Sequence, residues 1–428
     1  MRIALIYPEY YDIAHFGEKR KEIPPFGVLY LASILEEKGY FISVLRVSNE
    51  NFILDLKDYD IVGFSFSSSV TYSLIKKSIL HSFYSKDVLL IAGGIHATFF
   101  PIDIINECKI EVVCLGEGEN TILEIINEFQ TKNFHQIDGI IFKKGDNIIV
   151  TKKRKLIDDI NIIPFPARHY LDLEDIVMKD RLAESDLSIA HLLLSRGCTG
   201  RCYFCSNQVT KIRYRSGENI RKELLLLVEK YNIDGFCIID DNFIINKRKV
   251  VNICKEIKPL NLKWSSLSRV DSVDSDLLNT MKESGCIEIK YGIESGSQRI
   301  LDSMNKKVTV EQIKHAINIT HDVGINIKAF ILHGFPGENL ESTNETIELL
   351  ELLKEKISRI SLFRFVPLPG SYVYNNYSDF KLSLPESFED IFIYNNDKLW
   401  WGTEQDKLEL TKSYLLIENY VKNNWNKY

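Results

Sequence analysis

The 428-residue sequence lacks the features that define several large classes of protein. No stretch approaches the 18 or so uninterrupted apolar residues that a membrane-spanning helix needs, so we predict no membrane contact. There is no long basic run, and the formal net charge is −6, which argues against non-specific binding of nucleic acid. Eight cysteines are too few for a disulfide scaffold in a chain of this length.

The first ten residues, MRIALIYPEY, predict a short strand. They lack the basic region, long apolar stretch and cleavage site of a signal peptide, so we expect a cytoplasmic protein. Hydrophobic residues make up 45% of the chain and charged residues 26%, which is typical of a globular protein with an ample core. The length predicts two domains and a smaller additional region.

The N-terminal third alternates short apolar runs with amphipathic stretches, a pattern that predicts a doubly wound parallel sheet. The expected strands are 3–7, 41–46, 61–65, 88–92 and 112–115. Glycine and serine collect where these strands end, and ligands of open α/β sheets bind at the carboxyl ends of the strands. This domain is therefore expected to bind a ligand against exposed backbone, although a flavodoxin-like sheet that binds a nucleotide or nothing remains an alternative.

A second βα series begins at about residue 191 and predicts a partial (β/α)6 barrel of the TIM type. The expected strands are 191–196, 235–240, 263–269, 288–293, 327–333 and 359–365. Active sites of such barrels lie at the carboxyl ends of the strands. The end of the chain, 399–425, predicts a small helical region.

Three cysteines follow the first of these strands in the stretch SRGCTGRCYFCSN. Cys198, Cys202 and Cys205 form a C-x3-C-x2-C triplet on one predicted loop. A 4Fe–4S cluster is normally held by four cysteines, so three would leave one iron open to an exogenous chelating group, such as the amino acid end of S-adenosylmethionine (SAM). A structural zinc site is the alternative, but the nearest histidine, His191, lies within the predicted strand.

The triplet and three later motifs, IIDDNF (238–243), GIESGSQRIL (292–301) and FILHGFPGE (330–338), resemble the cobalamin-dependent branch of the radical SAM superfamily. The resemblance implies a Rossmann-like cobalamin-binding domain at 1–135 and a linker at 136–187. It also implies a radical SAM barrel at 188–370, followed by the C-terminal helical region at 371–428.

The same resemblance implies that the cysteine triplet holds the cluster and that residues at the strand ends contact SAM. The predicted SAM contacts are Phe204, Asp240, Asp241, Arg269, Glu294, Ser295, Gly334 and Pro336. Arg269 would face the SAM carboxylate and Glu294 the ribose hydroxyls. Structural alternatives stay open for the aspartates, which could cap a helix, and for Arg269, which could lie at the surface.

The N-terminal segments PPFGVLYLASIL (24–35), SFSSS (65–69), GGIHAT (93–98) and GEGE (116–119) resemble those of cobalamin-binding domains. The predicted cobalamin contacts are Ser65, Ser67, Ser68, Gly93, Gly94, His96, Gly116 and Glu117. The sequence departs from the D-x-H-x-x-G signature of such domains, because Asp12 and His15 stand as D-x-x-H-x-G. We therefore do not expect His15 to ligate cobalt.

The resemblance implies a cobalamin-dependent radical SAM methyltransferase. It would act on an unactivated carbon or phosphorus centre of a small molecule or peptide, through a 5′-deoxyadenosyl radical and methylcobalamin. Its electron donor would be a flavodoxin or ferredoxin. Oxidation, cyclisation or rearrangement without methyl transfer is an alternative, and a non-catalytic cobalamin sensor is another. The sequence does not identify the substrate.

Overall fold

The computed structural model describes residues 1–9, 12–13, 19–20, 23–85, 87–180, 187–207, 209–391 and 398–425. The chain divides into two compact units, which we call unit 1 and unit 2. Unit 1 consists of Met1–Asp175 and Glu386–Ile391, and unit 2 consists of Ile176–Pro385 and Phe392–Tyr428. His15, which the sequence analysis weighed as a cobalt ligand, lies outside the described residues.

Unit 1 is built on a seven-stranded sheet with the order β4-β1-β5-β6-β7-β8-β9. The strands are β1 (Arg2–Pro8), β4 (Phe41–Val47), β5 (Ile61–Ser65), β6 (Leu89–Gly93), β7 (Val112–Cys114), β8 (Ile140–Lys144) and β9 (Asn147–Val150). The first five strands in the sheet order are parallel, and β8 and β9 add an antiparallel edge. The parallel strands follow the flavodoxin-like order of doubly wound folds, as predicted.

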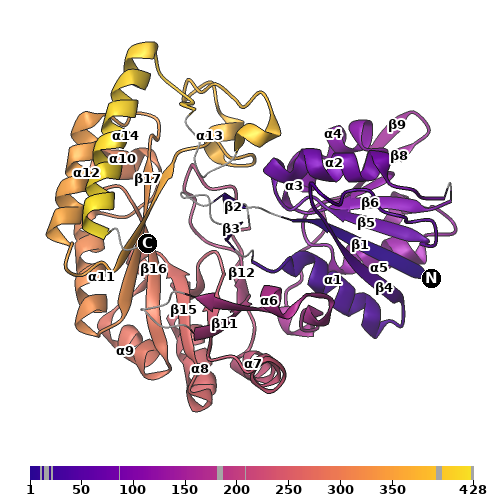
Figure 1. Cartoon of the computed structure of the whole chain (residues 1–428), viewed down its shortest axis with the longest axis horizontal. Coiled ribbons are helices and arrows are strands. Elements are labelled where there is room, and N and C mark those ends of the chain that lie inside the picture. The colour runs from indigo at the N-terminus through magenta and orange to yellow at the C-terminus, as the bar shows by residue number, and fades with distance from the viewer. Residues whose placement is uncertain are drawn as a thin grey trace. The chain divides into compact units, whose positions relative to one another are not determined.

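Helices cover both faces of the sheet of unit 1 (Figure 1). One face carries α1 (Phe26–Glu37) and α5 (Glu119–Asn127), and the other carries α2 (Tyr72–His81), α3 (Ile95–Phe99) and α4 (Pro101–Glu107). The strands between them are almost continuous apolar runs, because both faces of a parallel sheet are buried. The remaining short elements are β2 (Asp12–Ile13), β3 (Lys19–Arg20) and α6 (Leu173–Ile176).

Unit 2 is built on an open, curved sheet of seven strands (Figure 1). Its order is β10 (Val177–Asp180), β11 (Leu187–Leu192), β14 (Gly235–Ile238), β15 (Lys263–Ser268), β16 (Cys286–Glu294), β17 (Asn326–His333) and β18 (Arg359–Arg364). The strands from β11 to β18 are parallel, which confirms the predicted partial (β/α)6 barrel. A separate two-stranded ladder pairs β12 (Ser195–Arg196) with β13 (Arg213–Tyr214).

Helices of unit 2 lie outside the curved sheet (Figure 1). The helices of this unit are α7 (Gly217–Tyr231), α8 (Lys247–Ile257), α9 (Ser275–Glu283), α10 (Gln298–Ser303), α11 (Val310–Asp322), α12 (Leu340–Leu352), α13 (Tyr372–Asn375) and α14 (Glu404–Trp425), and the short α13 contacts Tyr203 and not the outer face of the sheet. Alternate residues of β16, such as Ile289, Tyr291 and Ile293, pack into the core beneath these helices. Glu288 and Lys290 therefore project from the opposite, inner face of the sheet.

Two features of the first barrel strand depart from the sequence analysis. The strand was predicted at 191–196, but β11 ends at Leu192, and Ser195–Arg196 leaves the sheet to pair with β13. In addition, β10 pairs antiparallel with β11, although its residues fall within the predicted linker at 136–187. The apolar run 191–194 obscured the end of the strand, because periodicity alone does not mark where a buried strand leaves its sheet.

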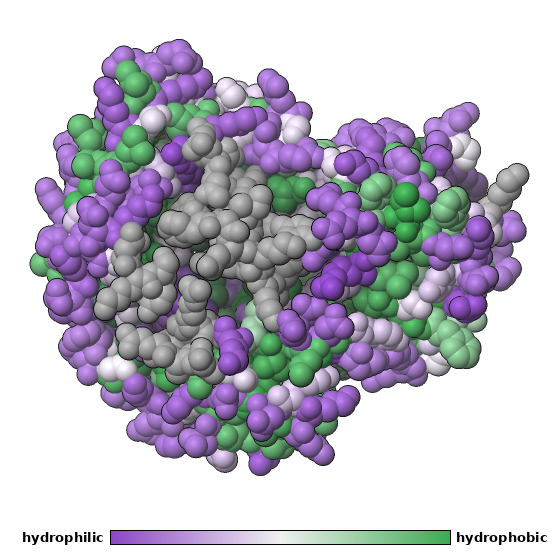
Figure 2. Space-filling model, in the orientation of Figure 1, coloured by the Kyte–Doolittle hydropathy of each residue, from purple (hydrophilic) through white to green (hydrophobic). Residues whose placement is uncertain are grey.

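The described part of the chain contains no helix that is long and apolar enough to cross a membrane. On the face shown in Figure 2, hydrophilic side chains predominate over the coloured surface, and apolar side chains are scattered among them. The long C-terminal helix, α14, packs against α12 and β18 through Tyr414 and Ile417, which are both buried.

Candidate functional site

The cysteine loop, which we define as residues 197–207, begins five residues after β11 ends. Gly197 opens the loop with a φ of +96°, and a Cβ there would lie 2.5 Å from the carbonyl oxygen of Lys211. The loop doubles back because the amide of Cys198 donates to the carbonyl of Val209 at 2.9 Å. A residue other than glycine at position 197 would open this turn.

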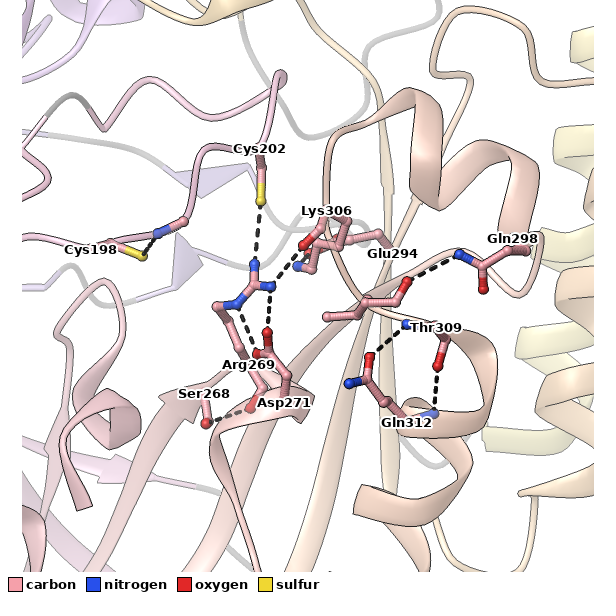
Figure 3. Close-up of polar contacts among 12 residues, drawn as sticks. Cys198, Cys202, Ser268, Arg269, Asp271, Glu294, Gln298, Lys306, Thr309 and Gln312 are labelled. Atoms are coloured by element: carbon pink, nitrogen blue, oxygen red, sulfur yellow. Dashed lines mark hydrogen bonds and ion pairs between the residues drawn. The ribbon is translucent and has the colours of Figure 1, made fainter.

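Each of the three cysteine sulfurs accepts one N–H group. The amide of Gly200 donates to Cys198 Sγ at 3.3 Å, and the amide of Asn207 donates to Cys205 Sγ at 3.4 Å. Cys202 Sγ lies 3.6 Å from Nη1 of Arg269 (Figure 3). Hydrogen bonds of this kind stabilise sulfur that carries negative charge, as thiolates bound to iron do.

Gly200 leaves space between two of the sulfurs. A Cβ on this residue would lie 3.3 Å from Cys198 Sγ and 3.9 Å from Cys202 Sγ, so a side chain would occupy the space that the two sulfurs face. No group of three His, Cys, Asp or Glu side chains among the described residues converges as the ligands of a single metal ion would. A loop of spaced thiolates instead suits a cluster, in which each cysteine binds a different iron.

Desolvation acts on two of these thiols. It raises the pKa of Cys205 to about 11, and it also raises the pKa of Cys202, where the nearby cations Lys306 and Arg269 oppose the shift. A bound metal overrides such shifts, because a coordinating thiol is deprotonated outright.

The cysteine loop is anchored to the segment that follows α10. The amide of Tyr203 donates to the carbonyl of Met304 at 2.9 Å, and Asn305 Nδ2 donates to the carbonyl of Arg201 at 2.7 Å. The ring of Tyr203 also stacks on that of Tyr372, with a centroid separation of 4.1 Å. These contacts fix the loop at both its backbone and its side chains.

Arg269, at the carboxyl end of β15, connects several parts of the site (Figure 3). Its Nε and Nη2 atoms donate to the two carboxylate oxygens of Asp271 at 2.9 and 2.8 Å. Nη2 also donates to the carbonyl of Lys306 at 2.7 Å. The side chain is 14% exposed, so the structure places it within the site and not at the surface.

Glu294, at the end of β16, forms a buried ion pair that sequence analysis did not find. Its Oε1 atom lies 2.6 Å from Nζ of Lys306, and the two side chains are 11% and 5% exposed. The φ of Glu294 is +67°, and β16 shifts register against β17 at this point. Gly292 makes room for the pair, since a Cβ there would lie 2.5 Å from Glu294 Oε1. Lys306 also lies over the ring of Phe204, 5.8 Å from its centroid.

The two predicted aspartates after β14 have different partners. Asp240 is buried, and its carboxylate accepts from the amide of Leu194 at 2.8 Å and from the hydroxyl of Ser195 at 2.6 Å. Burial raises the pKa of Asp240 to about 7, against the lowering effect of those hydrogen bonds. Asp241 instead accepts from Nδ2 of Asn207, at the end of the cysteine loop, at 2.6 Å. Both aspartates therefore hold the chain on either side of the cysteines.

A hydrogen bond between Gly334 and Glu338 stabilises the turn after β17. Gly334 and Gly337 have φ values of +92° and +91°, and the amide of Gly334 donates to Glu338. Burial raises the pKa of Glu338 to about 8. Trp401 Nε1 donates to the carbonyl of Gly334 at 2.8 Å, so the C-terminal region braces this turn.

The remaining predicted SAM contacts, Ser295 and Pro336, follow the same strand ends. The hydroxyl of Ser295 is fully buried and lies 3.2 Å from that of Thr346. Pro336 is half-buried within the turn after β17.

In unit 1, the predicted cobalamin contacts gather at the carboxyl ends of β5, β6 and β7. Gly94 has a φ of +106°, and a Cβ there would lie 2.6 Å from the carbonyl oxygen of Phe66. The adjacent Gly93 is different, because a Cβ there would meet no atom closer than Cys114 Cβ at 3.7 Å. Ser65 and Ser68 are half-buried, and Ser67 and Gly116 are exposed. This end of the sheet therefore offers accessible backbone and hydroxyl groups to a ligand.

Two residues of this set are engaged within the protein. His96 is fully buried among Phe66, Tyr72, Phe100 and Phe388, and its Nδ1 atom lies 2.9 Å from Ser69 Oγ. Burial lowers the pKa of His96 to about 4. Glu117 Oε2 accepts from the amide of Ile157 at 3.1 Å.

Two family models match the chain. Residues 192–350 match the radical SAM superfamily, and residues 17–126 match the B12 binding domain. The first match includes the cysteine loop and the ends of β14 to β17, and the second includes β4 to β7 of unit 1 and the loops that follow β5, β6 and β7.

Curated relatives resemble most of the chain. An uncharacterized methyltransferase of Pyrococcus horikoshii is 29% identical and covers 81% of this chain and 77% of its own length. A cytidylyl-2-hydroxyethylphosphonate methyltransferase of Streptomyces wedmorensis is 26% identical over 81% of this chain and 76% of its own length. An anaerobic magnesium-protoporphyrin IX monomethyl ester cyclase of Cereibacter sphaeroides is 28% identical over 82% of this chain and 59% of its own length.

Solved structures share the fold. The radical SAM methyltransferase TsrM from Kitasatospora setae superposes with a TM-score of 0.69 at 15% identity, covering 90% of this chain and 78% of that one. The cobalamin-dependent SAM radical enzyme OxsB superposes with a TM-score of 0.65 at 18% identity, covering 89% and 56%. The two domains together define a radical SAM enzyme with a cobalamin domain. The chain carries both domains of the cobalamin-dependent radical SAM enzymes, and these two domains imply a 4Fe–4S cluster, SAM and cobalamin as its cofactors.

The ion pair between Glu294 and Lys306 allows a test of the site's energetics. Lys306→Met should lower the free energy of unfolding by about 3–5 kcal/mol, because it leaves a buried carboxylate without its cation. Adding Glu294→Gln to Lys306→Met should recover most of that loss. Urea unfolding followed by circular dichroism measures both values. Equal instability of the single and double variants would show that the pair is not coupled.

Proposed function

We propose that this enzyme methylates an unactivated carbon or phosphorus centre of a small-molecule or peptide substrate. The observation that carries the proposal is the joining of two sites in one chain: a three-cysteine loop with N–H donors to each sulfur, and a B12 binding domain. Two of the similar curated proteins are named as methyltransferases, which favours methyl transfer over other radical reactions.

In this proposal, the cysteine triplet holds the cluster in unit 2, and the half-buried loop leaves one iron for SAM. When bound, the cluster and SAM supply a 5′-deoxyadenosyl radical, and cobalamin supplies the methyl group. Glu294 accepts hydrogen bonds from the ribose hydroxyls, and Lys306 offers a cation beside it for the carboxylate of SAM. Asp240 positions the start of the cysteine loop through Leu194 and Ser195.

In this proposal, some of the other predicted SAM contacts would touch SAM, and the rest would support the residues that do. Phe204 packs beside Lys306, and the adenine would lie against the Gly334–Gly337 turn, where Pro336 is half-buried and Gly337 is exposed. Ser295 supports the end of β16 through the contact of its hydroxyl with that of Thr346 on α12. Asp241 holds the far end of the cysteine loop through Asn207.

In unit 1, cobalamin would lie against the loops that carry Ser65, Ser67, Ser68, Gly93 and Gly116. Gly94, His96 and Glu117 would shape these loops from within, since their contacts are already made inside the unit. A flavodoxin or ferredoxin would supply the electron that the cluster needs.

A second function within the same architecture is cyclisation or oxidation without methyl transfer. The similarity to a magnesium-protoporphyrin IX monomethyl ester cyclase supports it. The two functions differ in their products, so product analysis separates them.

The cluster assignment predicts loss of iron when a triplet cysteine is changed. Cys198→Ala, Cys202→Ala and Cys205→Ala should each abolish most of the iron and the broad visible absorbance after anaerobic reconstitution, since each removes one of three thiolates. Cys254→Ala is the matched control, because Cys254 lies on the buried face of α8. A triple alanine variant that kept its cluster would contradict the assignment.

The cobalamin site predicts a steric effect at Gly93. Gly93→Trp should reduce the cobalamin content of the purified protein by at least about tenfold while leaving the iron content unchanged, because the indole would fill accessible space beside the loops. Asn147→Trp is the control, since Asn147 is exposed on the edge strand β9 and lies outside the B12 binding match. Equal cobalamin in the two variants would place the ligand elsewhere.

Methyl transfer predicts a particular product ratio. Turnover with reductant, an extract of the native host and SAM carrying a deuterated methyl group should yield S-adenosylhomocysteine and 5′-deoxyadenosine in comparable amounts. Mass spectrometry should also find a product that carries the intact deuterated methyl group. If 5′-deoxyadenosine formed without S-adenosylhomocysteine and the converted substrate gained no methyl group, the enzyme would belong with the cyclisation or oxidation reactions.

A further inference from the structure

We propose that Arg269 is a positioning residue of the cluster: it donates an N–H group to the sulfur of Cys202 and thereby raises the reduction potential of the cluster. This inference rests on the proposed ligation of the cluster by Cys202. It assigns Arg269 a role that differs from the predicted contact with the SAM carboxylate.

The donors to the three sulfurs show why Cys202 is distinct. Cys198 and Cys205 each accept from a backbone amide two residues further along the same loop. Cys202 accepts from a side chain that comes from the end of another strand, β15 (Figure 3). A backbone amide is neutral, whereas a guanidinium carries a positive charge, so the hydrogen bond to Cys202 is the charge-assisted one of the three.

The hydrogen bonds of Arg269 leave little capacity for a second anion. A guanidinium has five N–H donors. One is directed to Cys202, two grip the carboxylate of Asp271, and one reaches the carbonyl of Lys306. The single remaining N–H, on Nη1, does not permit the bidentate grip that arginine uses on a carboxylate.

Asp271 fixes this geometry. Its two oxygens hold the Nε and Nη2 edge of the guanidinium, so Nη1 is directed toward the cysteine loop. Gly200 adjoins this contact, and a Cβ there would lie 3.5 Å from Nη1, at ordinary van der Waals distance. The strand end and the aspartate therefore act together to place one N–H on one sulfur.

The expected consequence follows from charge. Reduction adds one negative charge to the cluster, and a nearby cation and an N–H···S hydrogen bond stabilise the reduced form more than the oxidised form. Removing them makes the cluster harder to reduce, so the potential becomes more negative.

The test is a redox titration of reconstituted protein without SAM, monitored by electron paramagnetic resonance. Arg269→Met should lower the reduced-to-oxidised ratio at a fixed potential by about tenfold, which corresponds to ~59 mV for one electron. Arg269→Lys, which keeps the charge but loses the fork, and Arg269→Gln, which keeps N–H donors but loses the charge, should give smaller shifts in the same direction. Arg299→Met is the control, because this exposed arginine contacts Gly337 and Asn339 and no cysteine.

An unchanged potential and spectrum in Arg269→Met, with full iron content, would overturn the inference. So would a shift that appears only after SAM is added, since it would place Arg269 on SAM. Should Arg269→Met fail to assemble a cluster, unchanged potentials in both Arg269→Lys and Arg269→Gln would be decisive against it. Cys202→Ala separates the ligation of the cluster from the role of Arg269. A cluster retained in that variant would refute ligation by Cys202, whatever Arg269 does.

Discussion

One constraint shapes the site: the short cysteine loop must hold three sulfurs without burying them against apolar groups. Sulfurs that bind iron carry negative charge, so they require N–H donors, and a loop that bends sharply enough to supply its own amides requires Gly197 and Gly200. Such a loop has little stability of its own. Hydrogen bonds from Tyr203 and Asn305 therefore stabilise the loop by tying it to the segment after α10. Asp240 adds a hydrogen bond to Leu194, which precedes the loop.

The curved sheet explains why these supports lie within reach. The six parallel strands of unit 2 end at one edge, and their side chains alternate between the helix-covered core and the inner face. Residues that follow different strands therefore meet although they are distant in sequence: Cys202 and Arg269 are 67 residues apart. The same alternation keeps Ile289 and Tyr291 in the core while Glu294 turns into the site.

Sequence patterns predicted the strands and the positions of the motifs, but not the partners of individual side chains. The doubly wound sheet and the partial barrel followed from periodicity, since buried strands and amphipathic helices differ in period. The end of β11 did not, because Leu193 and Leu194 continue its apolar run. Lys306 lay in a polar segment without a pattern, although it pairs with Glu294. Which side chain pairs with Glu294 depends on the directions in which side chains point at the strand ends, and local periodicity does not predict those directions.

Carboxylates at four strand ends show how a motif can serve structure and cofactor together. Asp240 holds the chain before the cysteine loop, Asp271 orients Arg269, and Glu338 closes the turn after β17. Glu294 differs from Asp240 and Glu338, because its partner is a lysine side chain and not a backbone amide. A lysine can swing toward another anion, whereas a backbone donor cannot. In the proposed function, this pair would therefore separate to admit a charged ligand, while the other carboxylates hold the strand ends in place.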